Sequence, residues 1–215
     1  MIGVVTYAAT LLATLPARLV VPRTGFVQDV AGTVWEGSAA LTGGHALRWY
    51  WSPLGSIGSG SVAADWVLDG PDTVLTGVGH WRPGGTSVDQ VAGRAGWALV
   101  ALAAPALPLS CDTVLSLRNA SGAADRFGGE VSSTAGHCGP RGTVPTAPVP
   151  RLLGLATDNG SVSRLSLTPW TARNLKLIDV TLSRDRTLII EITPAGAAQL
   201  GGTLPPRGAT MEMHL

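Results

Sequence analysis

Two neighbouring stretches decide the fold of this chain: residues 32–37, with the sequence GTVWEG, and residues 48–54, with the sequence RWYWSPL. In the second stretch Trp49 and Trp51 are spaced two residues apart, and Leu47 continues the same spacing. Successive side chains of a β-strand point to opposite faces of a sheet. The spacing therefore predicts a strand with one apolar face, and the glycines between the two stretches predict the turns of a hairpin.

The same alternation of period two recurs along most of the chain, and glycine- and proline-rich turns separate the alternating segments. Because these turns are short, consecutive strands are expected to pair in antiparallel fashion. The predicted fold class is mainly β: an antiparallel meander of short strands, arranged as a curved sheet or as a sandwich. Strands are expected at residues 26–35, 38–41, 45–51, 62–68, 73–81, 88–91, 111–117, 129–135, 151–156, 162–167, 175–183 and 187–192.

Two short helices are expected to interrupt the strands. Residues 96–104 are rich in alanine and leucine and end before Pro105, which cannot continue a helix. Residues 193–200 begin with Thr193 and Pro194, a residue pair typical of the N-cap and first position of a helix.

The composition limits the classes of function. The chain has 215 residues, of which 45% are hydrophobic and only 13% charged, and its formal net charge is +1. The charged fraction is about half of the roughly 25% that is usual in globular proteins. A charge this small provides no strong field to attract nucleic acid, so a nucleic-acid partner is not expected.

The N-terminal segment predicts a membrane anchor. Residues 1–15 carry no charged side chain, and Arg18 is close enough to the end of the apolar segment for its side chain to reach the interface. A bilayer core needs about 20 apolar residues in a helix, so residues 1–21 are expected to form an anchor helix that is close to the threshold length. A secretory signal peptide and a buried helix of a soluble protein are the alternatives.

The remaining chain is expected to form one β-rich domain over residues 22–200, followed by a flexible tail at 201–215. A subdomain boundary is predicted near residues 141–150, which contain three prolines.

Cys111 and Cys138 are the only cysteines, and they are 27 positions apart in or beside predicted strands. If those strands are neighbours, the separation of the two Cα atoms can reach the value that a disulfide requires. A disulfide would place the domain in an oxidising compartment such as a periplasm. Two buried free thiols are the alternative, and a zinc site with His137 is a weaker one because it lacks further ligands.

No motif indicates catalysis or a cofactor. The four histidines lie outside any HExxH pattern, no GxSxG sequence is present, and no phosphate-binding glycine loop follows a predicted strand. The chain is therefore predicted not to be an enzyme and to bind neither cofactor nor metal.

The seven tryptophans are open to two interpretations. An exposed aromatic platform would bind a ligand, whereas most of these residues are in phase with apolar neighbours on the predicted strands, which favours packing in a core with the indole N–H bonded to backbone. The residues expected to have such structural aromatic or turn roles are Trp35, Gly37, Trp49, Trp51, Pro53, Trp66, Pro169 and Trp170.

A series of short motifs resembles the type II secretion system protein N family, also called general secretion pathway protein N. The motifs, in order, are LATLPARLV at 12–20, GTVWEG at 32–37, LRWYWSPLG at 47–55, DWVLDGP at 65–71, VDQVAGRAGWALV at 88–100, GHCGP at 136–140, LSLTPW at 165–170 and ITPAG at 192–196. Each motif is weak alone, and their order and spacing carry the resemblance. The N-terminus departs from the family because it is shorter than the usual charged and apolar anchor.

The resemblance implies a protein of the inner membrane with one N-terminal helix and a periplasmic β-rich domain. Its expected role is that of an accessory, non-enzymatic component that contacts other proteins of the type II secretion system. A periplasmic lipid-binding or lipid-bridge β domain is the alternative, for which a continuous apolar groove would be needed. A secreted hydrolase or sugar-binding β protein is the third hypothesis.

Overall fold

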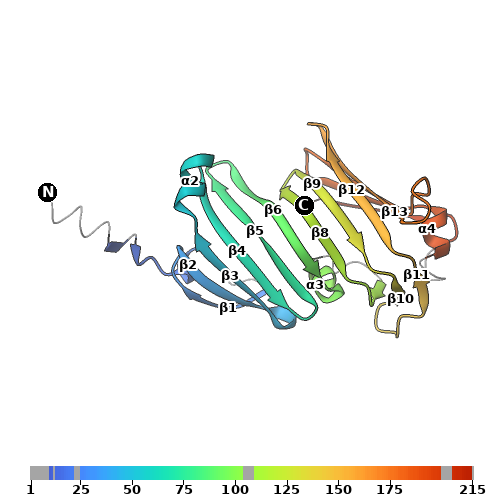
Figure 1. The fold of residues 1–215 in the computed structure, drawn as a ribbon, viewed down its shortest axis with the longest axis horizontal. Coiled ribbons are helices and arrows are strands. Elements are labelled where there is room, and N and C mark those ends of the chain that lie inside the picture. The colour runs from blue at the N-terminus through green and yellow to red at the C-terminus, as the bar shows by residue number, and fades with distance from the viewer. Residues whose placement is uncertain (1–9, 12, 22–24, 104–108, 200–204, 215) are drawn as a thin grey trace.

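The computed structural model of the protein describes residues 10–11, 13–21, 25–103, 109–199 and 205–214. Most of these residues belong to one antiparallel sheet of 13 strands (Figure 1). Its strands are β1 (Val27–Gly32), β2 (Glu36–Leu41), β3 (His45–Trp51), β4 (Val62–Gly70), β5 (Thr73–Arg82), β6 (Gly85–Ala95), β8 (Leu115–Ala123), β9 (Arg126–Ser133), β12 (Leu152–Asp158), β13 (Val162–Pro169), β14 (Ile178–Ser183), β15 (Thr187–Ile192) and β16 (Ala209–His214).

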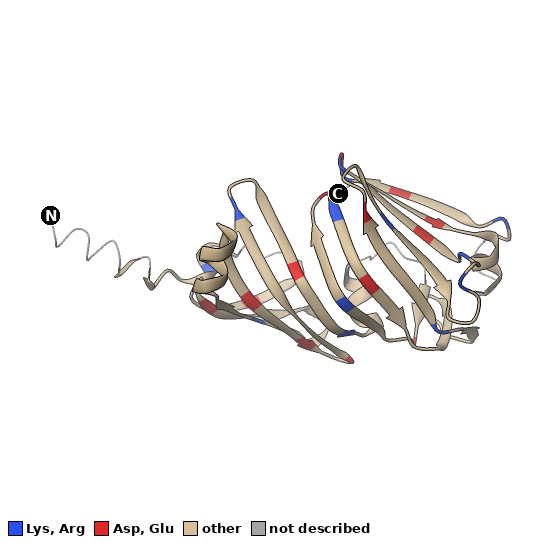
Figure 2. Cartoon of the chain, turned by 45° about the horizontal axis from the view of Figure 1, so that its top comes forward, with Lys and Arg blue, Asp and Glu red and all other residues tan. Residues whose placement is uncertain are grey.

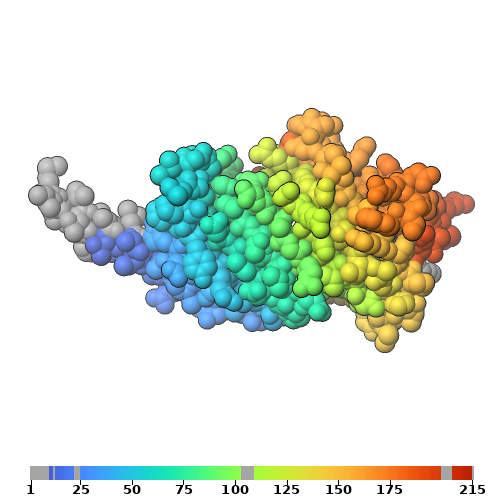
Figure 3. All heavy atoms as spheres, viewed as in Figure 1, coloured from blue at the N-terminus to red at the C-terminus, as the bar shows by residue number. Residues whose placement is uncertain are grey.

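The strands follow one another across this main sheet in the order of the sequence. Figure 3 shows the consequence: the colours run in bands along an elongated body, from blue at one end to orange and red at the other. The predicted mainly β, antiparallel meander is confirmed.

A second, smaller sheet has three strands in the order β11-β10-β7. It contains β7 (Leu109–Cys111), β10 (Gly136–Pro140) and β11 (Ala147–Val149). The described helical segments are η1 (Ala17–Leu19), η2 (Thr42–Gly44), α2 (Pro53–Ser59), α3 (Trp97–Ala103) and α4 (Pro194–Gln199).

The main sheet has one apolar and one polar face. In β3 the side chains of Leu47 and Trp49 pack into buried clusters, as the alternation predicts, whereas Arg48 points to the other face and forms an ion pair of 3.1 Å with Asp69. Helix α3 covers part of the apolar face, where Leu99 packs against the cluster of Leu68, Leu75 and Ala95. Figure 2 shows few acidic and basic residues, scattered along the strands, in agreement with the charged fraction of 13%.

Glycines opposite tryptophans let large rings lie flat on the apolar face. Gly37 is the cross-strand partner of Trp49, and a Cβ atom at Gly37 would lie 2.9 Å from Cε2 of that ring. Gly77 is paired in the same way with Trp66, where a Cβ atom would lie 2.7 Å from Cζ2. Side chains directly opposite each other in an antiparallel pair are close neighbours, so the missing side chain provides the space for the ring.

The predicted disulfide is present. Cys111 of β7 and Cys138 of β10 are direct cross-strand partners with a Cα–Cα distance of 4.1 Å, and they form a disulfide bond. Both are buried, in a cluster that also contains Leu152 and Ile192 of the main sheet. The small sheet is thereby held over the apolar face of the C-terminal strands.

The two predicted helices are confirmed as α3 and α4. Thr193 caps α4, because its Oγ1 accepts a hydrogen bond of 3.1 Å from the backbone N–H of Gly196. Helix α2 was not predicted. It begins at Pro53, which occupies an N-terminal helix position, and ends at Gly60 in the left-handed conformation.

Several strand boundaries differ from the sequence predictions, for example β6, which is expected at 88–91 and spans Gly85–Ala95. Three further differences concern the organisation of the chain. The single strand expected at 111–117 is wrong, because the chain leaves the small sheet after Cys111 and enters the main sheet at Leu115. The flexible tail expected at 201–215 is wrong for Ala209–His214, since β16 pairs with β15 at the edge of the sheet. At 141–150 the main sheet is continuous, because β9 pairs with β12 across this segment and β11 lies within it.

The predicted anchor stays a prediction. Of the predicted anchor at residues 1–21, residues 1–9 and residue 12 lie outside the described residues. Within the part of the chain that is described, no helix combines the length and the apolar character needed to cross a bilayer.

Arg184 connects three turns at one end of the strands. Its guanidinium donates to both carboxylate oxygens of Asp158, at 3.0 and 2.9 Å, and to the backbone oxygens of Gly160 and Asp125, at 3.0 and 3.1 Å. The backbone N–H of Gly160 and then the side chain of Arg184 lower the pKa of Asp158 below its ordinary value of 3.8. The ionised carboxylate is thus the form that the fold stabilises.

A pH dependence of stability follows from this cluster. A lowered folded-state pKa contributes stability above the unfolded value of 3.8, and this contribution is lost as the pH falls through the folded-state pKa. We expect Asp158→Asn to lower the thermal midpoint at neutral pH and to differ less from the wild type as the pH falls below about 3.8. Thermal unfolding followed by circular dichroism over this pH range measures the effect. Asp65→Asn, at an exposed position of β4, is the control, and an equal loss in both variants would contradict the role of Asp158.

Candidate functional site

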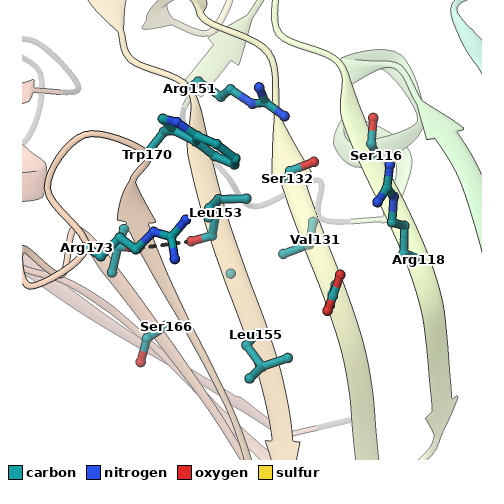
Figure 4. A pocket seen from close by; sticks show the side chains of 13 residues that line it. Ser116, Arg118, Val131, Ser132, Arg151, Leu153, Leu155, Ser166, Trp170 and Arg173 are labelled. Atoms are coloured by element: carbon teal, nitrogen blue, oxygen red, sulfur yellow. Dashed lines mark hydrogen bonds between the residues drawn. The ribbon is translucent and has the colours of Figure 1, made fainter.

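A groove on the polar face of the main sheet has a volume of about 680 Å³ and crosses β8, β9, β12 and β13 (Figure 4). Its lining includes charged, hydroxyl and apolar side chains together. The lining residues are Ser116, Arg118, Glu130, Val131, Ser132, Arg151, Leu153, Gly154, Leu155, Ser166, Thr168, Trp170 and Arg173.

The strand register arranges most of this lining in two rows that cross four strands. One row contains two serines, a leucine and a threonine: Ser116, Ser132, Leu153 and Thr168. The next row contains both charges and a second leucine: Arg118, Glu130, Leu155 and Ser166. Because neighbouring strands are about 4.8 Å apart, each row presents four side chains in a line perpendicular to the strands.

Trp170 and two arginines close one end of the groove. The guanidinium carbon of Arg151 lies 4.4 Å from the centre of a Trp170 ring, and that of Arg173 lies 5.4 Å away. In the view of Figure 4 the two arginine side chains approach the indole from either side. Trp170 is 46% exposed, so the expectation that it packs in a core is wrong: it follows the end of β13 and holds two cations at the surface.

The groove has an excess of positive charge. Three arginines line it, at positions 118, 151 and 173, against the single carboxylate of Glu130. None of the ion pairs between described residues includes these arginines. An anionic group that enters the groove would therefore meet guanidinium groups whose N–H donors are free of carboxylate partners.

The other tryptophans are divided between core and surface. Trp49 and Trp66 are half-buried on the apolar face, as predicted, and Trp35 lies 5.0 Å from Trp51, measured between ring centres. Trp51 is 44% exposed, and its Nε1 donates to Oγ of Ser56 and not to backbone. The predicted backbone partner is also missing for Trp66, whose buried Nε1 has no acceptor among the described residues.

The remaining predicted positions have structural roles. Gly37 faces Trp49, Pro53 begins α2, and Pro169 is buried at the end of β13 beside the groove residue Trp170. None of these three lines the groove.

An exposed apolar surface lies at the α2 end of the sheet. Val62 of β4 and Trp81 of β5 are direct cross-strand partners on the face that carries Trp66, and they are 44% and 57% exposed. Val88 of β6, opposite Gly79, continues this surface. Leu54 and Ile57 of α2 are also exposed. The exposed apolar side chains that are neighbours across β4, β5 and β6 form a surface suited to contact with another molecule.

One histidine lies between a serine and an aspartate, which the sequence did not indicate. His80 Nδ1 is 3.0 Å from Oγ of Ser61, and its Nε2 is 3.6 Å from a carboxylate oxygen of Asp89. The second distance exceeds that of a hydrogen bond, and Oγ of Ser61 is also 2.6 Å from Oγ of Ser59. The cluster is at the opposite end of β5 from the turn to β4 and shares no residue with the groove.

Among the described residues, no group of three or more His, Cys, Asp or Glu side chains is arranged to hold a metal ion.

The chain matches no family model, no curated protein and no solved structure.

The arginine–tryptophan arrangement could not be identified from the sequence, although one part of it is local. Trp170 and Arg173 are three residues apart and follow a predicted strand. Arg151 joins them only because β12 pairs with β13, which brings its carbonyl oxygen within 2.8 Å of the Trp170 backbone N–H.

Proposed function

We infer that this chain is an accessory, non-enzymatic component of a type II secretion system, held at the inner membrane by its N-terminal segment. Its periplasmic β domain supports protein export across the outer membrane through contacts with other components of the system. The order and spacing of the motifs from 12–20 to 192–196 support the assignment of this chain to a type II secretion system.

The exposed apolar surface at the α2 end carries the proposal of a protein-contacting role. Exposed apolar patches on a folded domain mark sites of association when they are larger than scattered single residues. Here Val62, Trp81 and Val88 are neighbours across three strands, and Trp51 lies on the same face of β3. The tryptophans in this patch also belong to the residue types that contribute most to protein interfaces.

The disulfide supports the proposed location. A bond between Cys111 and Cys138 persists in an oxidising compartment and is rare in a reducing cytosol. A periplasmic domain fits this condition.

Measurement of protein export in the organism that carries the gene tests the proposed role in secretion. We expect deletion of the gene to leave exported proteins in the periplasm, and the wild-type gene to restore their release into the medium. Complementation with Val62→Asp is expected to restore less, because a charge would be placed in the apolar contact surface. Quantitative proteomics of medium and periplasm measures both effects.

Val74→Asp is the matched control. Val74 is 48% exposed, close to the 44% of Val62, but it lies on the polar face of the same pair of strands. Normal release of exported proteins by the deletion strain would contradict the proposed function. Equal complementation by the two variants would contradict the assignment of the contact to the apolar surface.

A lipid-binding or lipid-bridge domain is the second candidate, supported by the apolar face of β3, β4 and β5, which is exposed at Trp51, Val62 and Trp81. Lipid retained by the purified domain in native mass spectrometry would favour this candidate.

A further inference from the structure

We propose that the groove across β8, β9, β12 and β13 binds an acidic peptide segment of a partner protein, in which carboxylate side chains stand next to an aliphatic one. The choice of a peptide rests on the proposed role in protein contacts. The choice of an acidic and partly apolar sequence rests on the groove alone.

Trp170 acts as a platform for the two guanidinium groups and not as a stacking surface for the ligand. Arg151 and Arg173 already lie 4.4 and 5.4 Å from its ring centre. A sugar ring would have to displace a cation to stack there. Arginines stacked on an aromatic ring keep their planar N–H donors available and lose less freedom when they bind a carboxylate. The arrangement therefore favours recognition of an anionic oxygen group.

The charges of the groove favour a carboxylate-bearing chain over a compact multivalent anion. Arg118 and Glu130 are cross-strand partners in one row, so the groove presents one negative side chain between Arg118 and Leu155. An extended peptide can place carboxylates at the arginines and a neutral or donor group opposite Glu130. A dense anion would bring like charge close to that carboxylate.

Beside its charged side chains, the groove also has exposed leucines that an aliphatic side chain of the ligand can contact. Leu155 is 59% exposed in the row of Arg118 and Glu130, and Leu153 lies two residues away on the same face of β12. Burial of an exposed leucine by an aliphatic side chain of the ligand is favourable, at about 25 cal/mol per Å² of apolar surface. The hydroxyl groups of Ser116, Ser132 and Thr168 complete a lining that can bond to peptide groups.

The size and place of the groove also fit a protein segment. Its volume of about 680 Å³ is within the usual range of roughly 300–1,000 Å³ for ligand pockets. It lies on β8 to β13, whereas the described N-terminal segment at Ala17–Leu19 packs against β1 at the far edge of the main sheet. If the N-terminus is held at a membrane, the groove is on the part of the domain that extends away from it.

Selection from a phage-displayed library of random dodecapeptides tests the proposal with the purified full-length protein. The wild type is expected to select peptides enriched in Asp or Glu beside Leu, Ile or Val. The double variant Arg151→Glu/Arg173→Glu is expected to lose this enrichment, and Arg164→Glu, an exposed arginine of β13 that does not line the groove, is expected to keep it.

Fluorescence anisotropy with the most strongly selected peptide then gives affinities. We expect the double variant to bind at least about tenfold more weakly, and the peptide with Gln in place of each Glu to do the same. Binding is expected to weaken as the salt concentration rises towards about 1 M, where the Debye length is about 3 Å. Trp170→Leu, which keeps every charge, is expected to weaken binding because the arginines lose their platform.

Selection without acidic enrichment, or an equal effect of Arg151→Glu/Arg173→Glu and Arg164→Glu, would overturn the proposal. Cosedimentation with phosphatidylglycerol vesicles that depends on Arg151 and Arg173, in the absence of acidic peptide selection, would overturn it in favour of a lipid headgroup. Circular dichroism shows that each variant is folded. The peptide measurements use purified protein and the secretion test uses cells, so failure of one proposal is distinguishable from failure of the other.

Discussion

Replacement of Trp49 by alanine is expected to lower the free energy of unfolding by about 3 kcal/mol, near the lower end of the range for truncation of a large core aromatic residue. Trp49 is half-buried on the apolar face, where it packs against the cluster of Val30 and Ala39 and covers Gly37. Alanine would leave a cavity above a glycine, which has no side chain to fill it. Urea unfolding followed by circular dichroism measures the change.

Trp81→Ala is the matched control for this prediction. Trp81 is in a neighbouring hairpin of the same sheet but is 57% exposed, so its loss is expected to change stability by less than about 1 kcal/mol. Equal effects of the two substitutions would show that Trp49 is not a core residue. Retained stability of Trp49→Ala with loss of partner binding would instead make the tryptophan a recognition residue.

Loss of the disulfide is expected to lower the free energy of unfolding by a similar amount. In the chain-entropy model, a bond that closes a loop of 27 residues between Cys111 and Cys138 contributes about 3–4 kcal/mol. We therefore expect Cys111→Ser/Cys138→Ser to unfold at a clearly lower urea concentration than the wild type. The small sheet that covers the cluster of Leu152 and Ile192 would be the first part affected.

Reductant provides the internal control for the disulfide. It is expected to shift the unfolding midpoint of the wild type to that of the double serine variant, and to leave the variant itself unchanged. A wild-type midpoint that does not respond to complete reduction, verified by thiol titration, would contradict a stabilising role for the bond.

Local pattern was sufficient to predict most of the meander. The strands at His45–Trp51 and Thr187–Ile192 have the predicted bounds, because each has clear alternation and a turn on both sides. The segment after Cys111 was mispredicted because its alternation continues while the chain passes from one sheet to another. Helix α2 was missed because Gly55 and Gly58 are poor helix formers, and its first turn depends on Pro53.

The candidate site was less predictable than the fold. The disulfide could be inferred because only two cysteines are present and both lie near predicted strands. The groove depends on the pairing of β8 with β9 and of β12 with both β9 and β13, which places Arg118 and Arg151 on one surface. Trp170 was expected to have a structural aromatic or turn role, and only the pairing of β12 with β13 brings Arg151 to its ring beside the nearby Arg173.

The sequential order of the strands has a consequence for the kinetics of folding. In the main sheet almost every strand pairs with the strand that precedes it in the chain, and the exceptions, at β6–β8 and β9–β12, skip only the strands of the small sheet. Pairings between segments close in sequence require the closure of short loops, which is associated with fast folding among β proteins. A chain that emerges from a translocation channel with its N-terminus first would find the partner of each new strand already in place. The disulfide between Cys111 and Cys138 could form as soon as β10 has emerged, before the last five strands of the main sheet are available.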